Sequence, residues 1–247
     1  MSSVAVSLTA FAFVFGGAVV GMLLSRSLPQ SHLGADSKET VKLGMGLVST
    51  MSALVLGLLV SSAKSFYDTQ SAELNQVSAD VVTLDRLLAH YGPETKEARD
   101  LLRGSVVRQL EVMWPQKGTR SGAPGTSEAL IDKLQRLSPK DDKQHSLQAQ
   151  AVSMAINLGR VVWLMYEQGV ASVSKPLLVI MVFWLTVVFV SYGLFAPHNA
   201  TTITSLFAAA LSVSGAIFLI LEMYTPYGGL IEISSAPLRS ALAHLGQ

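Results

Sequence analysis

Residues 43–63 read LGMGLVSTMSALVLGLLVSSA and contain no charged side chain, and Lys42 and Lys64 stand directly before and after them. As a helix, these 21 residues rise about 1.5 Å each, which matches a hydrocarbon core roughly 30 Å thick. Lysine side chains at both ends can reach the lipid headgroups. We therefore predict that this block spans a membrane.

Three further uncharged blocks have nearly the same length, at residues 4–24, 177–196 and 202–221. The first lacks the basic start and the cleavage site of a signal peptide, so we expect it to remain as an anchor. The last two are separated by a short connection, which predicts an antiparallel hairpin across the bilayer. The chain is thus expected to be an all-α membrane protein with four transmembrane helices, in hairpins at residues 1–64 and 175–222.

The composition agrees with this class and excludes others. Of the 247 residues, 50% are hydrophobic and 14% charged, whereas soluble chains carry roughly 25% charged residues. The net charge is +1, so the chain lacks the basic field that nucleic-acid binding uses. Because there is no cysteine, disulfides, thiolate nucleophiles and cysteine-ligated metals are excluded.

A polar segment, residues 65–174, separates the second span from the third and is expected to be a helical, water-soluble insert. Apolar residues recur in it at steps of three and four, which places them in a seam on one face of a helix. The first seam comprises Leu74, Val77, Val81, Leu84, Leu88 and Tyr91, and the second comprises Leu147, Ala151, Met154, Leu158, Val161 and Met165. We interpret both as packing within the chain, with an intermolecular coiled coil as the alternative.

The helix of the first seam is expected to continue directly out of the second span and to stop at Gly92-Pro93, because glycine ends helices and proline begins them. A second helix is predicted up to Trp114-Pro115, followed by a short one before the second seam. The tail, residues 223–247, is expected to carry a short amphipathic helix.

Small residues repeat at steps of four along three of the spans, a spacing that lets helix backbones approach closely. The candidate face of the second span either lines a narrow pore or packs against another helix, and it consists of Ser49, Ser52, Ala53, Leu56, Gly57 and Ser61. We expect helix packing at Gly17 and Gly21 of the first span and at Ser205, Ala209, Ser212 and Ala216 of the fourth. The third span is bulky all round and is expected to face lipid.

Lys64 and Glu222 end the second and fourth spans, and the alternating directions of the spans place both at the same membrane surface. They are candidates for an interfacial ion pair, which would join these two helices where the insert begins. The alternative is that each side chain reaches into the headgroups independently.

No signature of an enzyme is present. The five histidines have no partner three or four residues away that would suggest a metal site. Phosphate-binding loops, nucleophile elbows and zinc-protease motifs are missing from the sequence. We therefore predict no catalytic, cofactor-binding or metal site, and no enzymatic activity.

The charges near the spans give conflicting indications of orientation. Arg26, Lys38 and Lys42 in the first loop favour a cytoplasmic location for that loop, which would place the insert on the other side. Lys64 and Lys175 at the two ends of the insert oppose this arrangement. We expect a multi-pass protein of a bacterial cytoplasmic membrane, with the side of the insert left open.

Several local patterns resemble those of one known family. They are Leu28-Pro29 with His32, Phe66 with Asp68, Tyr91-Gly92-Pro93, Trp114-Pro115, and a tail with Leu221-Glu222, Pro226, Gly229 and Pro237-Leu238-Arg239. With them the chain resembles the uncharacterised bestrophin-like bacterial integral membrane proteins, a family without an established activity. The resemblance implies four spans and a helical insert, and its label suggests an oligomeric anion channel. The second span nevertheless lacks the proline- and phenylalanine-rich neck of true bestrophins, and no calcium-binding acidic cluster is visible.

Two functions follow as hypotheses. The first is a self-associating structural, regulatory or sensor-like membrane protein whose insert binds a protein partner. The alternative is a homo-oligomeric channel whose second span lines the pore, with hydrophobic rings such as Leu56 or Leu59 as the gate. In both cases the expected partners are the lipid bilayer and further copies of the chain.

Overall fold

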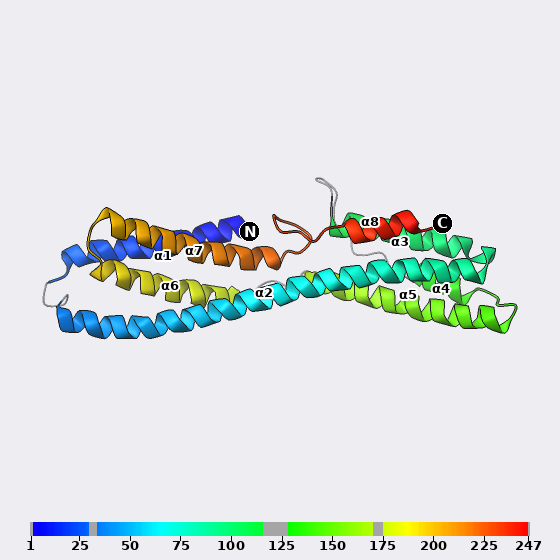
Figure 1. Cartoon of the computed structure of the whole chain (residues 1–247), viewed down its shortest axis with the longest axis horizontal. Coiled ribbons are helices and arrows are strands. Elements are labelled where there is room, and N and C mark those ends of the chain that lie inside the picture. The colour runs from blue at the N-terminus through cyan, green and yellow to red at the C-terminus, as the bar shows by residue number, and fades with distance from the viewer. Residues whose placement is uncertain (1, 30–33, 116–127, 170–174, 247) are drawn as a thin grey trace. The chain divides into compact units, whose positions relative to one another are not determined.

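The computed structural model describes residues 2–29, 34–115, 128–169 and 175–246 (Figure 1). Within these ranges the chain forms α-helices, one short 3-10 helix and no strand, so the all-α prediction is confirmed. His32 lies outside the described residues. The helices are α1 (Ser3–Ser27), α2 (Ala35–Tyr91), η2 (Pro93–Thr95), α3 (Lys96–Met113), α4 (Glu128–Gln135), α5 (Asp142–Gly169), α6 (Lys175–Phe195), α7 (Ala200–Met223) and α8 (Ala236–His244).

The chain divides into two compact units. The membrane unit comprises Met1–Phe66 and Ser172–Tyr224, and it contains α1, the first part of α2, α6 and α7. The insert unit comprises Tyr67–Ala171 and Thr225–Gln247, and it contains the remainder of α2 with η2, α3, α4, α5 and α8. The C-terminal tail, which the sequence suggested as a segment of its own, therefore packs with the insert.

Among the described residues, four helices are long and apolar enough to cross a membrane, namely α1, α2, α6 and α7. The four predicted spans fall on these helices. Helix α7 begins where it does because Asn199 caps it: the Asn199 side-chain oxygen accepts a hydrogen bond from the Thr202 amide at 2.8 Å. The cap separates α6 from α7 within the short connection that the sequence predicted.

Helices α1 and α6 pack with their backbones in close contact. A Cβ atom added at Gly21 would lie 2.1 Å from the Val190 carbonyl oxygen, and one added at Gly193 would lie 2.0 Å from the Ala18 carbonyl oxygen. Only glycine fits at such distances. At Gly17 the corresponding distance to the Thr186 carbonyl oxygen is 3.0 Å.

The expectation that the third span faces lipid is wrong for one face of α6. Met181, Leu185 and Phe189 on this face are buried in the core of the membrane unit. The bulky residues that suggested a lipid-facing helix include Phe183, which is exposed. A single glycine, Gly193, is enough for close contact because α1 supplies the repeated small residues.

In the insert unit, the seam of α2 forms the core, and each of its six residues is at most 4% exposed. In the second seam, on α5, Ala151, Leu158 and Met165 are buried. The same core contains Leu102 and Val106 of α3 and Leu238 and Ala241 of α8. The interpretation of the seams as packing within the chain is thus confirmed.

Two aromatic residues attach the tail to this core. The Trp114 indole N–H donates a hydrogen bond to the Ile233 carbonyl oxygen at 2.9 Å, and its ring meets Tyr227 edge to face. The Tyr227 hydroxyl donates to the side-chain oxygen of Gln70 at 2.8 Å. Burial, assisted by the negative charge of Glu73, raises the pKa of Tyr227 well above its ordinary value, so the hydroxyl stays a donor.

We predict that Gly21→Ala destabilises the membrane unit by about 1–3 kcal/mol, because the new methyl group would overlap the backbone of α6. The measurement is unfolding of the full-length protein in mild detergent by heat and by denaturing detergent. Gly215→Ala on α7 is the control, since a Cβ atom there meets nothing within 4 Å. Equal stability of the two variants would contradict the close packing of α1 and α6.

Candidate functional site

The candidate face of the second span is divided between the inside and the outside of the membrane unit. Ser52 is 1% exposed, and its hydroxyl donates to the Val48 carbonyl oxygen. Ser49 is half-buried, with its Oγ atom 3.2 Å from the Tyr192 hydroxyl of α6, and Leu56 is also half-buried. Ala53, Gly57 and Ser61 are exposed, so we name these three residues the outer face of α2.

The small residues of the fourth span also point mainly outward. Ser205, Ala209 and Ser212 are exposed and Ala216 is half-buried. The buried face of α7 consists instead of Ala210, Ser214, Ile217 and Ile220. Gly17 and Gly21 of α1, in contrast, pack against α6 of the same chain. Of the three small-residue rows, two thus lie on the surface of the membrane unit.

The fourth span also contains a buried hydroxyl, that of Ser214. Its Oγ atom has no hydrogen-bond partner among the described residues. An unpaired buried hydroxyl costs about 1–3 kcal/mol. No sequence signal marks it, because Ser214 lies beside the predicted row of small residues and not in it.

Helices α2 and α7 are joined near the ends of their spans by Tyr224. Its hydroxyl lies 3.1 Å from the Ser62 Oγ atom, and its ring stacks on Phe66 with the centroids 5.1 Å apart. Nearby, Glu222 is buried and Lys64 is exposed. The Lys64–Glu222 ion pair stays a prediction, and Tyr224 connects the two helices that it was expected to join.

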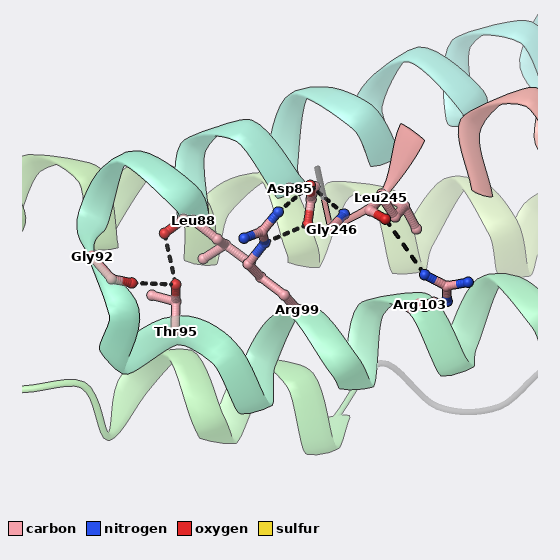
Figure 2. Close-up of polar contacts among 8 residues, drawn as sticks. All are labelled: Asp85, Leu88, Gly92, Thr95, Arg99, Arg103, Leu245 and Gly246. Atoms are coloured by element: carbon pink, nitrogen blue, oxygen red, sulfur yellow. Dashed lines mark hydrogen bonds and ion pairs between the residues drawn. The ribbon is translucent and has the colours of Figure 1, made fainter. Parts of the chain in front are cut away.

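In the insert unit, an ion pair holds α2, α3 and the tail together. Figure 2 shows Asp85 of α2, whose two carboxylate oxygens accept hydrogen bonds from Arg99 of α3 at 2.7 and 2.8 Å. One of these oxygens also accepts from the Gly246 amide at 3.2 Å. The Asp85 side chain is 2% exposed and that of Arg99 is 22% exposed. The bidentate geometry makes this a strong, directional contact.

The surroundings of Asp85 favour its charged form. Burial by itself raises the pKa of the carboxyl group, but the hydrogen bonds from Arg99 and Gly246 outweigh it, so the pKa lies below its ordinary value. Beside the pair, Thr95 closes the end of α2 by donating to the carbonyl oxygens of Leu88 and Gly92 (Figure 2). Gly92 has a φ of 139°, which explains why glycine stands where the helix was predicted to stop.

The hydrogen bonds that the structure gives Asp85 join α2, α3 and the tail, which are elements of the same unit, so this contact holds the insert unit together. Among the described residues, no group of three or more histidine and acidic side chains is arranged to hold a metal ion.

A second feature that the sequence did not reveal is a half-open, mainly apolar cavity of about 180 Å³ in the insert unit. Its walls include Val77 and Val81 of α2, Val106 of α3, and Leu158 and Trp163 of α5. The polar residues in the wall are Ser105, Glu128 and Gln109. Gln109 is 8% exposed, and among the described residues its side-chain amide donates to the Met113 sulfur at 2.9 Å. An apolar cavity of this size can hold a small apolar molecule. Its lining comes from several helices and forms no motif.

Comparison with known proteins gives one match. The family model described as Bestrophin-like domain matches residues 12–238, which confirms the resemblance seen in the sequence. No curated protein and no solved structure matches the chain.

We predict that Asp85→Asn lowers the free energy of unfolding by about 2–3 kcal/mol, because Arg99 then loses its charged partner in a mostly buried place. Unfolding of the full-length protein in mild detergent can be followed by tryptophan fluorescence, to which Trp114 at the tail contributes beside Trp163 and Trp184. The control is Glu94→Gln, whose pair with Lys140 lies at the surface, where solvent screens it, so this change should cost much less stability. Similar losses in both variants would contradict a clamp at Asp85.

The same contact predicts a dependence on acid. Because the pKa of Asp85 is lowered by folding, its stabilising effect is complete above the ordinary carboxyl pKa of about 3.9 and is lost as the pH falls through the lower folded value. Below about pH 4, the wild type should therefore lose stability more steeply than Asp85→Asn. Parallel pH profiles of the two proteins would overturn this assignment.

Proposed function

Because the chain belongs to the bestrophin-like family, we propose that it works as a self-associating, multi-pass membrane protein with a structural, regulatory or sensor-like role. In this proposal the membrane is a bacterial cytoplasmic membrane. The contact between copies is formed by the outer face of α2, and the insert unit binds a protein partner.

The observation that carries this proposal is the unused close-packing surface on α2. Within its most apolar window, 11% of the residues are buried inside the chain, compared with 33% in α1. A Cβ atom at Gly57 would meet nothing within 4 Å. Lipid tails are as apolar as leucine, so helices in a membrane associate through close packing at small residues. The contact of α1 with α6 is an example of such packing within this chain.

The apolar cavity of the insert unit supports the sensor-like part of the proposal. Its size fits a small apolar molecule, and the buried Gln109 offers one polar contact. A molecule bound there would stabilise the packing of α2, α3 and α5 against one another. The packing of these three helices, with or without a bound molecule, would then determine which surface the insert presents to its partner.

The second candidate is a homo-oligomeric channel, which the family label favours. In this case the outer face of α2 lines the pore with Ala53, Gly57 and Ser61. Leu59 is buried in its own unit, and Leu56 is half-buried. Leu54 and Leu58, which are 65% and 71% exposed, are therefore better candidates for a hydrophobic gate.

We predict that the wild type forms a defined oligomer in mild detergent and that Gly57→Leu weakens its association at least about tenfold, since the larger side chain separates the helices. Native mass spectrometry measures the mass. Gly44→Leu is the control, because Gly44 also has open space around it but lies off the row of Ala53, Gly57 and Ser61. A monomeric wild type would contradict self-association.

Ion flux into liposomes, measured with the same preparations, separates the two candidates. Flux from the wild-type oligomer that changes with Leu58→Ser would support the channel. An oligomer that gives no flux would support the structural or sensor-like role.

A further inference from the structure

The membrane unit contains a groove between the end of α1 and the start of α7. Its volume is about 270 Å³. One wall is a single face of α1, formed by Phe15, Ala18, Val19, Met22, Leu23 and Arg26, and the other is formed by His198 and Ile203. Val19, Leu23 and Ile203 are 40%, 56% and 45% exposed, so the groove is open to the surroundings of the unit.

The groove changes from apolar to charged along α1. From Phe15 to Arg26 the helix rises about 16 Å, and every residue of the α1 wall before Arg26 is apolar. Arg26 follows the uncharged block at residues 4–24, which places its guanidinium group at the level of the headgroups. A lipid has the same order of groups, with an apolar acyl chain followed by a polar headgroup.

The charged end of the groove is held in place by His198. The imidazole Nε2 atom lies 3.0 Å from the Met22 carbonyl oxygen and 3.3 Å from the Ser25 hydroxyl, which attaches the connection between α6 and α7 to the end of α1. Among the described residues, the Arg26 guanidinium makes no hydrogen bond or ion pair, and no carboxylate lines the groove. Within the described part of the chain these donors have no acceptor, so they can bind an anion from outside it.

We propose that this groove binds an anionic phospholipid, with one acyl chain along Phe15, Val19 and Ile203 and the phosphate at Arg26. An arginine presents a fork of donors that matches phosphate oxygens. Basic pockets between transmembrane helices are known to hold lipid headgroups of this kind. A zwitterionic lipid is a poorer occupant because its cationic group finds no acidic partner in the described lining.

The test uses the full-length protein in mild detergent and counts bound lipids per chain by native mass spectrometry, which makes it independent of self-association. Phosphatidylglycerol and phosphatidylcholine with identical acyl chains are titrated separately. Two variants address the groove: Arg26→Gln removes the charge, and Val19→Trp fills the apolar part. Their controls are Lys42→Gln, the same loss of charge at the same membrane surface, and Val20→Trp, an exposed neighbour on α1 outside the groove.

We expect phosphatidylglycerol to bind more tightly than phosphatidylcholine, and Arg26→Gln to weaken phosphatidylglycerol about fivefold and phosphatidylcholine by less, because the choline cation already offsets the phosphate charge. Val19→Trp should weaken both lipids, and the two controls should behave like the wild type. Equal losses in Arg26→Gln and Lys42→Gln, or unchanged binding in Val19→Trp, would overturn the proposal. Displacement of the lipid by millimolar inorganic phosphate would also overturn it, because the site would then recognise a free anion without the acyl chain.

Discussion

Inside a hydrocarbon core, every backbone N–H and C=O group must find its partner within the protein. This constraint makes the four spans helical. Because lipid tails are as apolar as leucine, the hydrophobic effect does not drive the spans together. What remains is close packing, which requires residues without bulky side chains at the contact. Gly17, Gly21 and Gly193 satisfy this requirement between α1 and α6. The other small-residue rows, on α2 and α7, are largely exposed, and this is why the proposed contact between copies lies on α2.

The two parts of helix α2 are stabilised by different interactions. In the block at residues 43–63 its small residues matter, because its neighbours there are lipid and other spans. From Leu74 onward its seam is heptad-like, because burial of Leu, Val and Tyr side chains away from water stabilises the insert unit. The ion pair of Asp85 and Arg99 belongs to this second part. Its hydrogen bonds have a defined geometry, so they fix how α3 is oriented against α2, which the apolar contacts of the core do not do.

Features that depend on local pattern could be predicted from the sequence. The spans follow from uncharged length, the seams from spacing, and the end of α2 from Gly92. Features that depend on the register between distant helices could not. Gly193 belongs to no repeat, so its importance appears only when Ala18 is placed against it. Asp85 meets Gly246, 161 residues later, and no spacing predicts this contact. The apolar cavity and the groove beside Arg26 are built from several helices, so neither forms a motif.

The packing of α1 on α6 and α7 has a consequence for synthesis of the chain. His198 contacts Met22 across 176 residues of sequence, and the whole insert is made in between. At roughly 5–20 residues per second, a ribosome needs about 10–35 s to cover this distance. During that time the face of α1 with Gly17 and Gly21 lies in the bilayer without α6, the helix on which it packs. During synthesis there is therefore a period in which the packing face of α1 contacts lipid or the insertion machinery, because α6 has not yet been made.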